Sequence, residues 1–99
     1  MFRVQLRMQT HPGKEQDFER AWLSGAGVIT GQPANRGQWL YASAQEPGVY
    51  HIISDWVDEP SFREYERSPQ HREHRVRLHP YRAAGSMTTM TTVYALEKQ

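Results

Sequence analysis

The chain has 99 residues and a formal net charge of +1 with its histidines neutral. This length corresponds to one domain, and the balanced charge disfavours a nucleic-acid-binding protein, which needs a clearly basic surface. The absence of cysteine excludes disulfides, cysteine-based zinc sites, iron–sulfur clusters and thiol catalysis.

The first predicted element is a strand over residues 2–9. Apolar and polar side chains alternate there, and a period of two is typical of a strand with one apolar face. The sequence Thr10-His11-Pro12-Gly13 follows and predicts a turn, because proline fixes φ and glycine permits positive φ. The apolar positions of the strand are Phe2, Val4, Leu6 and Met8.

A helix is expected to begin at about Lys14. Its apolar stripe falls at i, i+4, i+7 and i+11, which is one side of a helix. Gly25, Gly27 and Gly31 weaken the second half, since each glycine costs up to about 1 kcal/mol relative to alanine. We therefore expect an irregular helix tail, followed by a loop over residues 32–37. The stripe consists of Phe18, Trp22, Gly25 and Ile29.

Two strands over residues 38–43 and 49–57 are separated by the tight turn Glu46-Pro47-Gly48. So short a break predicts an antiparallel hairpin. A helix then begins near Asp58 or Glu59, with Pro60 in its first turn.

Ser68-Pro69 interrupts this helix and can cap a second piece, which runs to about Leu78 and is stopped by Pro80. Residues 87–96 are rich in threonine and predict the last strand. The order β-α-β-β-α-β predicts an α+β fold, a four-stranded antiparallel sheet with two helices on one face. We expect residues 2–96 to form its elements and 1–99 to be a single domain.

The hairpin strands carry bulky side chains at both parities. In the first strand, Trp39 and Tyr41 lie on one face and Leu40 on the other. In the second, Tyr50, Ile52 and Trp56 lie on one face, and Ile53 and Val57 on the other. A sheet with one solvated face should alternate cleanly. The pattern therefore predicts a homodimer in which a second copy covers the face without helices. The alternative is a monomer with exposed aromatics, which Arg3, Gln5 and Arg7 favour.

The chain resembles the antibiotic biosynthesis monooxygenase family through motifs spread over nearly its whole length. Each motif is weak alone, and their order and spacing carry the resemblance. Residues 85–90, Gly-Ser-Met-Thr-Thr-Met, are similar to members that accompany aromatic polyketide pathways. The other motifs are Pro12-Gly13-Lys14-Glu15, Phe18-Glu19, Trp22, Ser54-Asp55-Trp56, Phe62, Ser68-Pro69-Gln70-His71 and His79-Pro80-Tyr81.

The resemblance implies a ferredoxin-like fold assembled as a dimeric α+β barrel. It also implies oxidation of anthrone-like polyphenols to quinones by O₂ without metal or flavin. Trp56 matches the family's tryptophan at the end of the third strand, and Arg75 falls where oxygenase members can carry a functional arginine. Three positions depart from the family pattern, with Ile52 for an asparagine, Phe62 for an aromatic hydroxyl and Ala42 for a histidine. Haem cleavage is not expected, because Tyr65 and Arg75 stand where haem-degrading members carry tryptophan and histidine.

The predicted catalytic residues are Trp56, His71, His74 and Arg75. His71 and His74 lie at i and i+3, so one of them could act as a general base on a phenol. Arg75 could hold the resulting phenolate. The alternatives are a solvated polar face for the histidines, packing for Trp56, and an Arg75 ion pair with Glu73 or Glu64. The expected pocket walls are Tyr65, Phe62, Ile52, Tyr50 and Trp22.

A metal site is not expected, because a third ligand would be needed and His79 is poorly placed on that helix. His51 is expected at the dimer interface, since it lies on the face opposite Tyr50 and Ile52. Three functions follow as hypotheses: a cofactor-independent monooxygenase that oxidises a polycyclic aromatic polyketide, a small aromatic substrate, with O₂; a polyketide cyclase or isomerase; and a non-catalytic ligand-binding dimer. Neither a signal peptide nor an apolar run near 18 residues is visible, which predicts a cytoplasmic protein that binds neither membrane nor nucleic acid.

Overall fold

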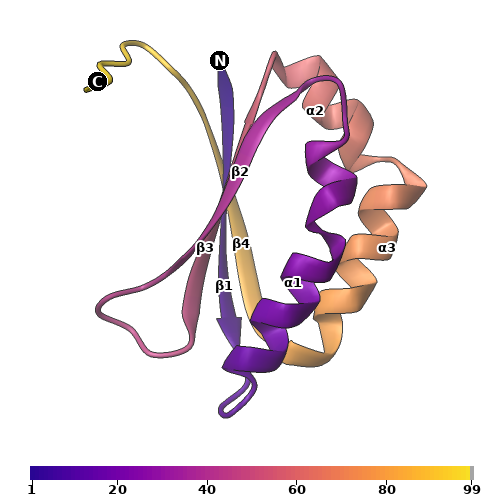
Figure 1. The fold of residues 1–99 in the computed structure, drawn as a ribbon, viewed down its shortest axis with the longest axis vertical. Coiled ribbons are helices and arrows are strands. Elements are labelled where there is room, and N and C mark those ends of the chain that lie inside the picture. Colours follow the sequence, from indigo (N-terminus) through magenta and orange to yellow (C-terminus); the bar gives the residue numbers. More distant parts are fainter. Residues whose placement is uncertain (99) are drawn as a thin grey trace.

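The computed structural model describes residues 1–98, so Gln99, the end of the predicted domain, lies outside the described residues. Figure 1 shows one sheet with every labelled helix on the same side of it. None of the helices within residues 1–98 is long and apolar enough to cross a membrane. The elements are β1 (Phe2–Thr10), α1 (Glu15–Thr30), β2 (Asn35–Ala42), β3 (Val49–Trp56), α2 (Glu59–Glu66), α3 (Pro69–Leu78), the 3₁₀ turn η1 (His79–Tyr81) and β4 (Arg82–Thr91).

The sheet is antiparallel throughout, with the strand order β2-β3-β1-β4. This is the ferredoxin-like arrangement, and it confirms the predicted α+β fold. In the register, Phe2 lies opposite Trp56 and Leu6 opposite Ile52. Because side chains alternate along a strand, the even-numbered residues of β1 and β3, and those of β2 after its register shift, face the helices, and the odd-numbered ones lie on the open face.

The starts of α2 and α3 follow from their capping residues, as predicted. The Asp58 carboxylate accepts a hydrogen bond from the Ser61 N–H at 2.8 Å. The Ser68 hydroxyl oxygen accepts one from the His71 N–H at 3.2 Å. A proline stands in the first turn of each helix, where its missing N–H costs nothing. The chain therefore bends between α2 and α3 and covers the sheet with two short helices.

The predicted last strand over residues 87–96 is wrong in its boundaries, because β4 spans Arg82–Thr91. Its partner β1 fixes these limits, since Thr91 pairs with Phe2 at one end and Arg82 with Thr10 at the other. Residues 92–98 extend past the start of β1 and form no strand. Threonine content indicated a strand, but only pairing could determine where it begins and ends.

Helix α1 is also more regular than predicted, since it continues to Thr30 through Gly25 and Gly27. Gly25 has a packing role, because a Cβ there would lie 2.9 Å from His74 Cε1 and would overlap Nδ1 of the same ring. The glycine lets α1 approach α3 closely. The stability of this contact offsets the low helix propensity.

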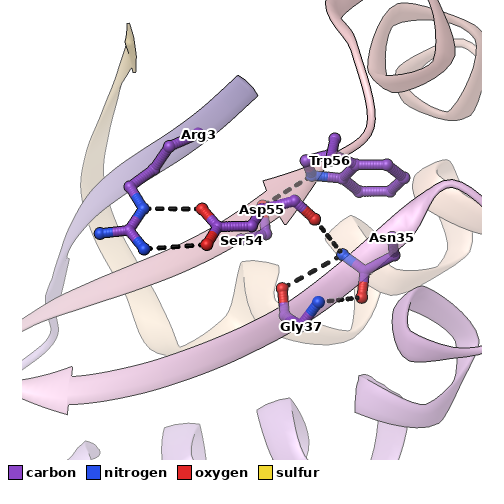
Figure 2. A network of polar contacts seen from close by, with 6 residues as sticks. All are labelled: Arg3, Asn35, Gly37, Ser54, Asp55 and Trp56. Atoms are coloured by element: carbon purple, nitrogen blue, oxygen red, sulfur yellow. Dashed lines mark hydrogen bonds and ion pairs between the residues drawn. The ribbon is translucent and has the colours of Figure 1, made fainter. Parts of the chain in front are cut away.

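Strand β2 begins at Asn35, three residues earlier than predicted. The Asn35 amide nitrogen donates to the carbonyl oxygens of Gly37 and Asp55, each at 3.2 Å, and its oxygen accepts from the Gly37 N–H at 3.0 Å. Figure 2 shows this side chain joining β2 to β3 at the register shift between them. The expected loop is therefore partly strand.

The open face carries large side chains that the helices do not cover. Trp39 is 40% exposed and Tyr41 51% exposed, and the register places both beside Ile53 and His51 of β3. The Arg3 guanidinium donates to both carboxylate oxygens of Asp55, at 2.6 and 2.8 Å (Figure 2). His51 lies on this face, on the side opposite Tyr50 and Ile52, as predicted.

Two buried clusters fill the space between sheet and helices. One surrounds Trp56, Phe62 and Tyr65 near the start of β1. The other surrounds Phe18 and Trp22 under α1. Leu6, in the middle of β1, packs against both clusters. Residues of both clusters line one cavity.

Candidate functional site

A cavity of about 330 Å³ opens between the helices and the covered face of the sheet. Its lining comes from every strand and from all three helices. The walls are largely apolar, which is typical of sites for small organic molecules. The volume lies at the lower end of the range of about 300–1,000 Å³ for such sites. The apolar lining includes Val4, Leu6, Met8, Trp22, Ile29, Ile52, Trp56, Phe62, Leu78 and Met87.

One wall of the cavity is built from stacked aromatic rings. Trp56 and Tyr65 stack with ring centroids 5.2 Å apart, and Phe62 packs edge-on against Trp56 at 5.4 Å. Trp56 is only 1% exposed, and its indole N–H already donates to the Ser54 hydroxyl at 2.9 Å. Trp56 therefore contributes a fixed ring to the wall, while its polar atom serves the fold.

Polar atoms without partners gather around the same cavity. Five side-chain atoms in residues 1–98 are shielded from water and have no hydrogen-bond partner there. Every one of them belongs to a residue that lines the cavity. An unpaired buried polar atom costs about 1–3 kcal/mol, so such a concentration indicates a place where a ligand supplies the missing partners. The atoms are Trp22 Nε1, Gln38 Oε1, the Tyr65 hydroxyl, His71 Nδ1 and His74 Nδ1.

The two histidines of α3 are biased toward their neutral forms. Burial lowers the pKa of His71 below its ordinary value, and the Arg75 charge lowers it further, while Glu66 acts in the opposite direction. Burial likewise lowers the pKa of His74, with contributions from His71 and Arg77. Both rings are therefore neutral at neutral pH, and a neutral imidazole can accept a proton.

Tyr65 has the opposite tendency, since burial raises the pKa of its phenol to about 12. It therefore stays protonated at neutral pH and can donate a hydrogen bond. Its ring also contacts His71 edge-on, with centroids 5.3 Å apart. A protonated phenol, a neutral imidazole and the stacked aromatic wall thus lie together at one end of the cavity.

Arg75 lines the cavity at its solvent-exposed side. Across the described part of the chain it forms no ion pair with Glu73, Glu64 or any other carboxylate. The structure therefore does not contain the surface ion pair that was the alternative role for Arg75. Glu66, also in the lining, is bound to Arg63 at 3.1 Å.

The structure brings most of the predicted site residues to this cavity. Tyr50 is the exception, because its ring packs on Phe18 with centroids 4.9 Å apart and its hydroxyl donates to the Glu19 carboxylate. Ala42 is exposed and also lies outside the lining. The residues that do line it are Trp56, Arg75, His71, His74, Tyr65, Phe62, Ile52 and Trp22.

Sequence reasoning missed five polar members of the lining: Gln38, Ser54, Glu66, Arg82 and Ser86. Gln38 and Ser54 are direct neighbours across β2 and β3, and the alternation of those strands could have placed both on the helix-facing side. The Gln38 amide nitrogen donates to the Ala26 carbonyl oxygen at 2.6 Å, which leaves its oxygen as the unpaired acceptor. Arg82 ends an arginine-rich stretch that indicates a mixed-charge helix face, and its strand was predicted to begin later, so it was not expected in the cavity.

Within residues 1–98, no group of three or more histidine or carboxylate side chains is arranged to hold a metal ion. The pair His71 and His74 therefore has no third ligand of these types. The chemistry open to the cavity's own residues is stacking, hydrogen bonding and proton transfer.

The sequence matches the family model described as antibiotic biosynthesis monooxygenase over residues 1–77. No curated protein is significantly similar to it in sequence. Among solved structures, SnoaB, a cofactor-independent oxygenase from Streptomyces nogalater, is 21% identical, with a TM-score of 0.86 and coverage of 98% of this chain and 97% of SnoaB.

Two further solved structures share the fold. A protein from Caulobacter crescentus provisionally assigned to the same family is 18% identical, with a TM-score of 0.85 over 94% of this chain and 90% of that one. A conserved protein from Methanosarcina mazei is 20% identical, with a TM-score of 0.81 over 90% of this chain and 89% of that one.

Proposed function

Because the chain belongs to the antibiotic biosynthesis monooxygenase family, we propose that it is a cofactor-independent monooxygenase that oxidises an anthrone-like polycyclic aromatic to a quinone with O₂. One observation carries this proposal: the cavity joins an aromatic wall to five polar atoms that have no partner. A flat phenolic ligand can stack on the wall and pair with some of these atoms. The structural similarity to SnoaB, a cofactor-independent oxygenase, supports the same function.

The reaction is balanced without an external reductant. The CH₂ group of the anthrone becomes C=O, one oxygen atom of O₂ enters the carbonyl, and the other leaves as water with the two hydrogens. This is a four-electron oxidation of carbon, and it matches the four-electron reduction of O₂. An ionised polyphenol is electron-rich and can pass the first electron to O₂ directly.

The cavity residues then have distinct roles in this proposal. Neutral His71 accepts the phenolic proton, which produces the reactive anion. Protonated Tyr65 donates a hydrogen bond to that anion, and Arg75 adds positive charge to the same cavity. Trp56 and Phe62 hold the ring system and shield the radical pair from water.

Oxygen consumption tests the proposal. With anthrone as the probe and chelator-treated protein, we expect O₂ uptake above the spontaneous rate, with one O₂ consumed for each anthraquinone formed. His71→Gln should lower the catalysed rate about 100-fold, the usual contribution of a general base. Arg72→Gln is the matched control for Arg75→Gln, because Arg72 is an exposed cation of α3 outside the cavity lining. No uptake above the spontaneous rate contradicts oxygenase activity toward anthrone, and unchanged rates in both cavity variants contradict the site.

A polyketide cyclase or isomerase is the second candidate. It is favoured by one observation, the two neighbouring histidines with unpaired Nδ1 atoms on the cavity wall, because an acid and base pair can catalyse ring closure without oxygen. Turnover of a polyketide-like substrate at equal rates with and without O₂ would support this function. A non-catalytic dimer would bind the aromatic without turnover in either atmosphere.

We also propose that two copies associate through their open faces. Exposed Trp39 and Tyr41 lie beside Ile53 there, and a second copy related by a two-fold axis would remove these side chains from water. The cavity lies on the other side of the sheet, so association leaves it available to a ligand.

A further inference from the structure

Two arginines from different elements line the cavity without a carboxylate partner. Arg75 belongs to α3, and Arg82 is the first residue of β4. Within residues 1–98 neither forms an ion pair, whereas Arg3, Arg7 and Arg63 all do. The carboxylate of the lining, Glu66, is held by Arg63. The cavity therefore carries an excess of positive charge beside apolar walls.

Gly85 shows that the side chain of Arg82 occupies a specific place. A Cβ at Gly85 would lie 3.3 Å from Arg82 Nη1 and 3.6 Å from Arg82 Cδ. Gly85 pairs with Met8 on the helix-facing side of the sheet, and both residues line the cavity. The backbone of Gly85 does not adopt positive φ, so conformation does not require a glycine. Its bare Cα instead leaves room for Arg82 to extend along the cavity side of β4.

We propose that Arg75 and Arg82 together bind a carboxylate carried by the aromatic ligand, whose rings lie against Trp56 and Tyr65. The guanidinium group matches a carboxylate in shape and donates two parallel hydrogen bonds to it. Two such groups beside a cavity of low polarity attract an anion more strongly than either would in open water. The charge of Arg75 already acts at the site, because it lowers the pKa of His71.

This inference rests on the proposed function in one respect: the bound ligand is a substrate only if the protein is an oxygenase. The ligand is a phenolic aromatic that also carries a carboxylic acid, which is ionised at neutral pH. The acid group would fix which end of the ring system lies beside Arg82. It would thereby select the ring position that reaches His71.

Ligand binding without turnover tests the inference. The probes are 2-naphthoate, its uncharged isostere 2-naphthamide, and 2-naphthol, with dissociation constants measured by calorimetry at low and high salt. We expect 2-naphthoate to bind at least about tenfold more tightly than the amide, a difference of about 1.4 kcal/mol. High salt should weaken the binding of the acid and leave that of the amide nearly unchanged.

Three variants identify the residues responsible. Arg82→Gln and Arg75→Gln should each remove most of the preference for the acid, and Arg72→Gln should keep it. Gly85→Ala should reduce it to a smaller extent, because a methyl group 3.3 Å from Arg82 Nη1 requires only a small shift of that side chain. Circular dichroism checks that each variant is folded.

Equal affinity for acid and amide in the wild type contradicts the inference, as does failure of 2-naphthoate to bind. A preference that survives Arg82→Gln removes Arg82 from the site. Tighter binding of 2-naphthol than of 2-naphthoate assigns the arginines to a phenol instead. If Arg82→Gln changes the oligomeric state but not the binding, Arg82 pairs with another copy of the chain, and the inference is wrong. Because none of these measurements needs O₂, the carboxylate preference and the oxygenase activity can fail independently.

Discussion

Trp56 combines complete burial with a place in the cavity wall. Its ring stacks on Tyr65 and its N–H is bonded to Ser54, so it contributes to stability whatever its part in catalysis. We expect Trp56→Ala to lower the free energy of unfolding by about 3–5 kcal/mol, as for other large buried side chains. Urea denaturation followed by circular dichroism measures this loss.

Leu23→Ala is the comparison, because the Leu23 side chain is 70% exposed on α1, away from the open face, and its loss should cost little. An equal cost for the two variants would contradict the structural role given to Trp56. Trp56→Phe is the better variant for activity, since it keeps an aromatic ring in the wall.

The histidines His71 and His74 predict how stability depends on pH. Their pKa values are lowered in the folded chain, while in the unfolded chain they return to about 6.5. Between the folded-state pKa and about 6.5 the unfolded chain binds more protons, so the free energy of unfolding must fall as pH decreases. The loss ends once the pH is below the folded-state values.

Urea midpoints measured between pH 7.5 and 5.5 test this, because the carboxylates remain largely ionised there. In His74→Asn the free energy of unfolding should depend less steeply on pH, even if the variant is less stable at every pH. An identical slope in the wild type and the variant would show that His74 contributes nothing to it.

At the scale of elements, the contact between α1 and α3 depends on Gly25. Alanine normally stabilises a helix by up to about 1 kcal/mol relative to glycine. At Gly25 the added methyl group would overlap the imidazole of His74, which is 7% exposed and cannot move aside easily. We expect Gly25→Ala to destabilise the protein by roughly 1–3 kcal/mol, the usual cost of overpacking.

Gly27→Ala is the matched control, because a Cβ there meets no atom within 4 Å. It should be neutral or stabilising by up to about 1 kcal/mol. In the double variant Gly25→Ala with His74→Ser, part of the loss should be recovered, since the smaller side chain leaves room. Thermal and urea unfolding of the wild type, Gly25→Ala, His74→Ser and the double variant give the coupling energy between the two residues. Equal effects of the two glycine substitutions would contradict a specific contact at Gly25.

At the scale of the whole molecule, the sheet has one face under helices and one face without them (Figure 1). The face without helices is mixed, since Trp39 and Tyr41 lie among polar side chains such as Arg3 and Asp55. We expect the protein to be a dimer in light scattering or sedimentation. Ile53→Lys should shift it toward monomer, because a charge beside Trp39 in the proposed interface cannot be desolvated cheaply.

Val76→Lys is the control for that variant. Val76 is also apolar and is 58% exposed, but it lies on α3, away from the open face. The Val76→Lys substitution should leave the oligomeric state unchanged. A wild-type protein that sediments as a monomer would favour the alternative of exposed aromatics on a solvated sheet.

The sequence by itself determined the element types, the α+β class and the two capped helix starts. These depend on local patterns, namely alternation in β1, the apolar stripe of α1, and Asp58 and Ser68 before prolines. It also determined the family resemblance, which the match over residues 1–77 confirms.

Tertiary structure decided the features that depend on partners distant in the chain. The limits of β4 follow from pairing with β1, the regularity of α1 follows from the contact of Gly25 with His74, and Tyr50 is held away from the cavity by Glu19. Arg82 enters the cavity only because β4 begins earlier than its composition indicates and because Gly85 leaves space beside it. No local pattern records such contacts, since each joins residues that the fold alone brings together.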